Sequence, residues 1–135
     1  MWGSSLQPRD MYITDDNEVV LAALKRRFTG KFRRVRVFSS GESLLYAIVH
    51  EVPDIIVLDL KMPGMGGIET LRRIRCIHPH ALVILLTAYG SSEDREVAQV
   101  LGVFDMVTKR VGLEDLDVAV TRALGRLGSG PQVSV

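Results

Sequence analysis

Polar side chains that could handle a charged group follow short apolar runs, at the points where strands of a sheet would end. Asp15 and Asp16 follow Met11–Thr14, Asp59 follows Ile55–Leu58, Thr87 follows Leu82–Leu86, and Lys109 ends the run that begins at Val103. The carboxyl ends of parallel strands meet at one edge of an α/β sheet, and ligands bind there. We therefore expect three carboxylates, a hydroxyl and an ammonium to converge.

Such a cluster needs positive charge, because neighbouring carboxylates repel and their pKa values rise unless a cation compensates. Lys109 supplies one positive charge, and a divalent ion such as Mg²⁺, which prefers oxygen ligands, would supply the other two. This arrangement suits phosphoryl transfer, in which catalysis is mostly positioning and neutralisation of charge. Asp59 is the best candidate nucleophile, since a carboxylate can become an aspartyl phosphate.

Asp59 also precedes a loop, residues 62–67, whose glycines allow backbone amides to approach a bound oxyanion. Taken singly, these residues have ordinary explanations: an aspartate or Thr87 can cap a helix, and Lys109 can be a surface side chain. Capping does not explain an acidic cluster that meets a lysine. We therefore favour the functional interpretation.

The apolar pattern predicts the scaffold that would position these residues. Ile55–Leu58 and Leu82–Leu86 are apolar throughout, which is typical of central parallel strands buried on both faces. Stripes at helical spacing separate the runs; the clearest comprises Leu113, Leu116, Val120, Leu124 and Leu127. Strand and helix alternate five times, which predicts an α/β fold with a five-stranded, doubly wound parallel sheet and helices on both faces.

Length and composition place this fold in one domain. The chain has 135 residues, a net charge of +1 and a single cysteine. We expect a leading tail over 1–8, a domain over 9–127, and a flexible tail or truncated linker over 128–135. No apolar stretch approaches the roughly 20 residues of a membrane span, and the start does not read as a signal peptide. These features favour a cytoplasmic location.

Four short pieces of the sequence also carry a family resemblance. They are Asp15-Asp16, Asp59-Leu60-Lys61-Met62-Pro63-Gly64-Met65, Thr87-Ala88 and Lys109. In this order and spacing they resemble the receiver domain of two-component response regulators, and the resemblance extends from about Arg9 to Leu127. It implies a flavodoxin-like sheet with strand order 2-1-3-4-5.

The resemblance also implies roles. Asp59 would accept a phosphoryl group from a histidine of a partner kinase or phosphotransfer protein. Asp15, Asp16, Asp59 and the backbone carbonyl of Lys61 would hold Mg²⁺. Thr87 and Lys109 would bind phosphoryl oxygens, and the surface of the fourth helix, fifth strand and fifth helix would change. Weak autophosphorylation from small donors and autodephosphorylation would accompany this switch, without a dedicated enzyme activity.

Four positions modify that expectation. Met106 replaces the family's usual aromatic residue, and we expect Phe104 on the same face of the strand. Arg110 replaces the usual proline, and Gly66 replaces an Asp or Asn. Tyr89, two residues after Thr87, is expected to hinder the water that hydrolyses the phosphoryl group.

Alternative functions follow from the same residues. A phosphate-independent pseudo-receiver, acting as an interaction module, is the main alternative, and Met106 and Arg110 favour it slightly. An aspartyl phosphatase is excluded, because its second Asp corresponds here to Lys61. The basic stretch Lys25–Arg36 is interpreted as a solvated edge or a dock for an acidic partner, with neither nucleic acid nor membrane binding. Self-association through the fourth and fifth helices stays open.

Overall fold

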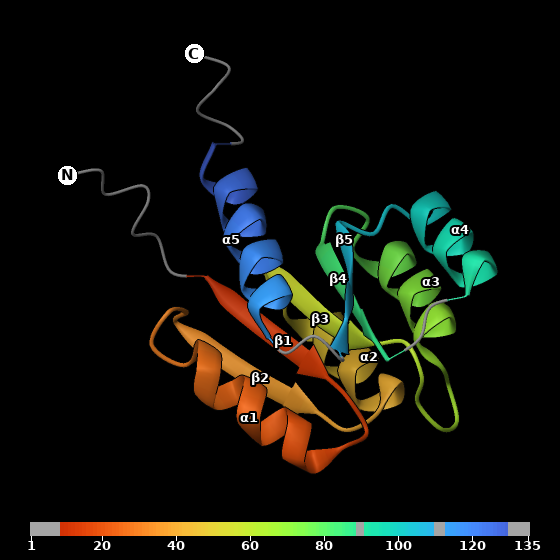
Figure 1. Ribbon diagram of the computed structural model, residues 1–135, viewed down its shortest axis with the longest axis horizontal. Helices are drawn as coiled ribbons and strands as arrows, with labels where there is room; N and C mark the ends of the chain where they lie inside the picture. Colours follow the sequence, from red (N-terminus) through yellow and green to blue (C-terminus); the bar gives the residue numbers. More distant parts are fainter. Residues whose placement is uncertain (1–8, 89–90, 110–112, 130–135) are drawn as a thin grey trace.

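A computed structural model describes residues 9–88, 91–109 and 113–129, and these form one parallel sheet flanked by helices (Figure 1). The strands lie in the order β2-β1-β3-β4-β5, which confirms the predicted order. Their bounds are β1 Asp10–Thr14, β2 Arg34–Phe38, β3 Ile55–Asp59, β4 Leu82–Thr87 and β5 Asp105–Thr108.

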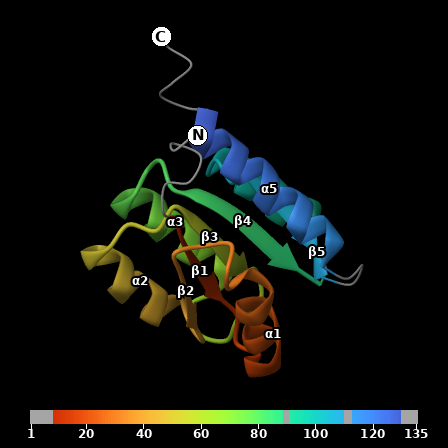
Figure 2. The ribbon, with the colours of Figure 1, turned by 90° about the vertical axis from the view of Figure 1, so that its left-hand side faces the viewer.

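The helices cover both faces of the sheet, as predicted. They are α1 Glu18–Phe28, α2 Gly41–His50, α3 Gly67–Ile77, α4 Ser92–Val100 and α5 Glu114–Ser129. Figure 2 shows α1 and α5 on one side of the sheet and α2 and α3 on the other. Each side encloses its own apolar cluster, and α4 joins the α2–α3 side through Ala98.

Strand β3 shows why the central runs lack a polar face. Ile55 and Val57 belong to the α1–α5 cluster, whereas Ile56 and Leu58 belong to the α2–α3 cluster. Successive side chains point to opposite faces of a strand, and here both faces are covered. The strand therefore needs apolar residues at every position until Asp59, at its carboxyl end.

Side-chain caps start three of the helices and so fix where the preceding loops end. Asn17 accepts hydrogen bonds from the N–H groups of Val19 and Val20 at the start of α1. Ser40 caps α2, and Ser91 caps α4. These caps satisfy backbone donors that have no partner inside the helix.

The prediction that Phe104 and Met106 share one face was wrong. Phe104 packs in the α1–α5 cluster, with the guanidinium groups of Arg122 and Arg126 over its ring, whereas Met106 packs in the α2–α3 cluster. The physical reason is that β5 begins at Asp105 rather than Val103. Strand alternation therefore does not extend back to Phe104.

The last described residues lie in helix α5. Helix α5 continues to Ser129, two residues past the expected end at Leu127, because a helix tolerates glycine in its final turn. The expected tails were residues 1–8 and 128–135, and of these 1–8 and 130–135 lie outside the described residues. No described helix combines the length and the apolar character needed to cross a bilayer.

Candidate functional site

The predicted acidic cluster forms at the carboxyl ends of β1 and β3, which are neighbouring strands. Thr14 of β1 pairs with Leu58 of β3 in the sheet. Asp15 and Asp59 are the next residues along these two strands, so they lie side by side. One carboxylate oxygen from each of Asp15, Asp16 and Asp59 lies within 4.8 Å of the others. Asp15 and Asp59 are buried, with 1% and 3% of their surface exposed, whereas Asp16 is exposed.

Lys109 reaches this cluster from beyond the end of β5. Its Nζ lies 2.8 Å from Asp15 Oδ2 and 3.3 Å from Asp59 Oδ1. Strands β3 and β4 lie between β1 and β5 in the sheet. The long Lys109 side chain therefore extends across the carboxyl ends of these strands to reach Asp15. The structure thus brings together Asp15, Asp16, Asp59 and Lys109.

The charges in this cluster do not balance. Burial and, to a smaller extent, the charge of Asp15 raise the pKa of Asp59, while Lys109 and the Lys61 N–H oppose the increase, and together these effects bring the pKa to about 6. For Lys109, burial lowers the pKa, but Asp15 and Asp59 outweigh it and the pKa rises. One ammonium therefore faces three carboxylates.

The donor set fits a divalent metal ion. Carboxylate oxygens that converge within 4.8 Å are hard oxygen ligands, and their excess negative charge matches a small dication. A bound cation would remove the repulsion that raises the pKa of Asp59. The acidic cluster can therefore hold a metal ion.

Backbone amides orient the two buried carboxylates. The N–H of Asn17 donates to Asp15 Oδ1 at 2.9 Å, and the N–H of Lys61 donates to Asp59 Oδ1 at 3.4 Å. Asn17 thus caps α1 and, through its backbone, holds a site carboxylate. The sequence analysis missed this residue, although an Asn just before a helical stripe is a recognisable capping signal.

Gly67 is a second residue whose role the sequence analysis missed. A Cβ at this position would lie 2.6 Å from the backbone oxygen of Asp59 and 2.6 Å from Leu60 Cα. Its N–H donates to Leu60 O at 2.9 Å, which closes the loop between Asp59 and α3. Gly66, the N-cap of α3, makes no side-chain capping bond, as expected where the family's Asp or Asn is absent.

The remaining candidate residues are placed as follows. Thr87 is buried at the carboxyl end of β4, beside β3, where Asp59 pairs with Leu86. Met106 pairs with Leu85 on the opposite side of β4. The Lys61 side chain is exposed at the rim. Tyr89 and Arg110 lie outside the described residues.

Comparison with known proteins agrees with this geometry. A profile of the response regulator receiver domain matches residues 11–121. The chain therefore belongs to the response regulator receiver domain family.

Relatives of known sequence are longer proteins. The DNA-binding transcriptional regulator NtrC of Klebsiella pneumoniae is 32% identical over 113 residues, which are 84% of this chain and 24% of the relative. The probable transcriptional regulatory protein TcrX of Mycobacterium tuberculosis is 30% identical over 134 residues, which are 96% of this chain and 57% of the relative. This chain thus spans about a quarter of NtrC.

Solved structures show the same fold. The BeF3-activated receiver domain of DrrB, a response regulator of Thermotoga maritima, is 30% identical with a TM-score of 0.80, covering 89% of this chain and all of that domain. A receiver domain protein of Methanospirillum hungatei has a TM-score of 0.84 at 23% identity, covering 89% of this chain and 96% of that one.

Proposed function

We propose that this domain is a phosphorylation-dependent signalling switch in which Asp59 accepts a phosphoryl group. The donor would be a phosphohistidine of a partner histidine kinase or histidine phosphotransfer protein. The observation that carries the proposal is the convergence of buried Asp59 with Asp15, Asp16 and the Lys109 ammonium. This convergence also argues against the phosphate-independent pseudo-receiver.

In the transfer step, an Asp59 carboxylate oxygen forms a bond to phosphorus while the bond from phosphorus to the donor histidine nitrogen breaks. Bound Mg²⁺ would offset negative charge on the transferring group. Asp15 and Asp16, with Asp59 and the Lys61 carbonyl, would hold this ion. Lys109, 3.3 Å from Asp59 Oδ1, would neutralise a phosphoryl oxygen, and the Thr87 hydroxyl would donate to another.

Phosphorylation would then act on α4 and β5. Helix α4 buries only Ala98 among its residues, so few apolar contacts hold it to the sheet. Its carboxyl end is more firmly held, because Arg75 donates to Leu101 O at 2.6 Å and to Gly102 O at 2.7 Å. We infer that the amino-terminal half of α4, which follows Thr87, moves most. Met106 would repack beside it in place of an aromatic rotation.

The partners expected from the sequence are part of the same proposal. The α4-β5-α5 surface would carry the output, including self-association, and the domain would act in the cytoplasm without binding nucleic acid or membrane. Four residues of the basic stretch already pair with carboxylates: Arg27 with Asp117, Arg33 with Asp10, Arg34 with Asp10 and Glu51, and Arg36 with Glu51. That pairing supports a solvated basic edge.

The proposal is tested by incubating the chain with Mg²⁺ and acetyl phosphate and measuring its intact mass. We expect one phosphoryl adduct that requires Mg²⁺, decays slowly by hydrolysis and is absent from Asp59→Asn. Tyr89→Ala is expected to hydrolyse the adduct faster. An Asp59→Asn chain that gains the same adduct would refute the assignment, and a chain that neither gains the adduct nor binds fluoroberyllate would refute the switch.

A further inference from the structure

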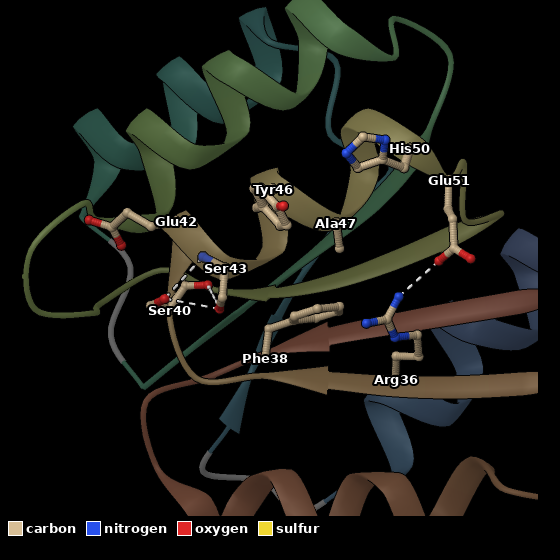
Figure 3. A pocket seen from close by; sticks show the side chains of 9 residues that line it. All are labelled: Arg36, Phe38, Ser40, Glu42, Ser43, Tyr46, Ala47, His50 and Glu51. Atoms are coloured by element: carbon tan, nitrogen blue, oxygen red, sulfur yellow. Dashed lines mark hydrogen bonds and ion pairs between the residues drawn. The ribbon is translucent and has the colours of Figure 1, made fainter.

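Helix α2 presents a row of exposed side chains that the proposed switch does not use. Its inner face buries Leu44, Leu45 and Ile48, whereas 76% of the Tyr46 surface is exposed. Glu42, Tyr46 and His50 follow one another at intervals of four residues, so they stand on one face of the helix. Figure 3 shows their side chains along α2.

Tyr46 stands between two hollows in the surface. One has a volume of about 670 Å³ and lies between α2 and the edge strand β2, over Phe38 and Ala47 (Figure 3). The other has a volume of about 370 Å³ and lies between α2 and α3, beside Met65 and Ile77. The same surface therefore carries both a protruding aromatic ring and apolar hollows that could accept such a ring. Such a surface can fit a second copy of itself.

The charges along α2 are arranged in the same self-complementary way. Glu42, at the amino end, has no ion-pair partner within the described part of the chain. Near the carboxyl end, three guanidinium groups share two carboxylates: Arg33, Arg34 and Arg36 pair with Asp10 and Glu51. One end of the row therefore carries unpaired negative charge, and the other carries an excess of positive charge.

We propose that a second copy of this chain docks on this face, with the two α2 helices antiparallel about a two-fold axis at Tyr46. Residues equally distant from the axis then meet, so Glu42 faces the partner's His50 and the basic end beside it. Each Tyr46 ring lies against the partner's Tyr46 and enters the hollow over Phe38. A parallel pairing would instead place like charges together, which is unfavourable.

The first test is sedimentation velocity of the full chain from micromolar to near-millimolar concentration. We expect a concentration-dependent dimer that Tyr46→Ser weakens by at least about tenfold, since an aromatic anchor at the interface centre is lost. Val19→Ser on α1 is the matched control, because Val19 is 78% exposed and lies outside both α2 and the α4-β5-α5 surface. A chain that stays monomeric, or a dimer that Tyr46→Ser weakens no more than Val19→Ser does, would overturn the proposal.

Charge reversal tests the antiparallel register separately. Glu42→Arg is expected to weaken the dimer, and Glu42→Arg combined with His50→Glu is expected to restore it, because each new arginine again faces a carboxylate. A double variant that dimerises no better than Glu42→Arg would contradict this register. Far-ultraviolet circular dichroism of each variant checks that the exposed substitutions leave the fold intact.

Disulfide trapping gives the sharpest test. In a Cys76→Ser background, chains carrying Glu42→Cys are mixed with chains carrying His50→Cys and oxidised. The mixture should form cross-linked dimers, whereas each variant alone should not, because its two copies would lie about 12 Å apart along the helices. Disulfides need a Cα separation below about 7 Å. Efficient cross-linking of Glu42→Cys with itself, or none in the mixture, would overturn the arrangement.

Discussion

Two clusters of charged side chains lie at opposite ends of β1, and they differ in how their charges are balanced. At the start of the strand, buried Asp10 accepts hydrogen bonds from Arg33 at 3.0 and 2.6 Å. After its end, Asp15 shares the Lys109 ammonium with Asp59, and the carboxylate of Asp16 lies beside them. The Arg33 hydrogen bonds lower the pKa of Asp10, whereas burial and Asp15 raise that of Asp59.

This difference separates a structural cluster from a binding site. Around Asp10, cations outnumber carboxylates, so the negative charge is stabilised within the chain. Around Asp59, the carboxylates carry more negative charge than Lys109 neutralises. A bound metal cation would offset the remaining repulsion between them. We therefore interpret the carboxylate cluster at the carboxyl edge of the sheet as the proposed binding site rather than as a stabilising feature.

The largest expected effect on stability comes from the cluster around Asp10, where cations balance the negative charge. Asp10→Asn should lower the free energy of unfolding by about 2–3 kcal/mol at pH 7, because the charged hydrogen bonds to Arg33 are lost. Urea denaturation at constant pH measures it. Glu69→Gln, whose exposed pairs with Arg72 and Arg73 contribute little, is the control. Equal losses of stability in Asp10→Asn and Glu69→Gln would contradict the stabilising role assigned to the buried Asp10 carboxylate.

The corresponding substitution of Asp59 by Asn should change the free energy of unfolding in the opposite direction. Without metal at pH 7, Asp59→Asn should raise the free energy of unfolding by about 1–2 kcal/mol, because it removes a buried charge whose pKa is raised. Urea denaturation in the presence of a chelator gives this value. A destabilised Asp59→Asn chain would contradict the account of charge imbalance.

The pH dependence of these two effects should also differ. Because the folded pKa of Asp59 is about 6 and its usual value is 3.8, the wild-type chain loses stability relative to Asp59→Asn as pH rises between these values. The gain from Asp59→Asn should therefore vanish below that window. For Asp10, whose pKa is lowered, the loss in Asp10→Asn should shrink as pH falls below 3.8. Denaturation series over pH distinguish the two directions.

Magnesium should act on one cluster only. At ten times its dissociation constant, Mg²⁺ should stabilise the wild-type chain by about 1.4 kcal/mol, since it binds the folded state. Asp10→Asn should keep this response and Asp59→Asn should lose most of it. Thermal unfolding with and without Mg²⁺ measures both responses. An equal response of the two variants would mean that Asp59 does not contribute to metal binding.

The smallest expected effect concerns the cap that supports the site. Asn17→Ala should cost about 1 kcal/mol of stability, because the N–H groups of Val19 and Val20 lose their acceptor. The backbone bond from residue 17 to Asp15 is retained, so Mg²⁺ affinity should change by less than stability does. Denaturation and Mg²⁺ titration of the same variant compare the two.

Much of this could be predicted from the sequence, because burial leaves a strong local pattern. The run Ile55–Leu58 has no polar residue, which indicated a central strand and placed Asp59 at its end. The meeting of Asp15, Asp16 and Asp59 then followed from strand order. Lys109 was also expected at this edge.

Other features depend on tertiary contacts that have no local signal. Phe104 and Met106 lie two residues apart, but the start of β5 at Asp105 places them on different faces. The close approach at Gly67 arises because α3 begins against the backbone of Asp59. The pairing of Asp10 with Arg33 depends on the register of β1 and β2. None of these is encoded by residue type or spacing alone.

The central claim, that Asp59 is the nucleophile of the unbalanced cluster, is tested most directly by mapping the modified residue. The chain is phosphorylated with acetyl phosphate and Mg²⁺, reduced with borohydride to convert an aspartyl phosphate to homoserine, and sequenced by peptide mass spectrometry. The account predicts homoserine at position 59, with Asp15 and Asp16 unchanged. Homoserine at either of those positions, or at none, would contradict it.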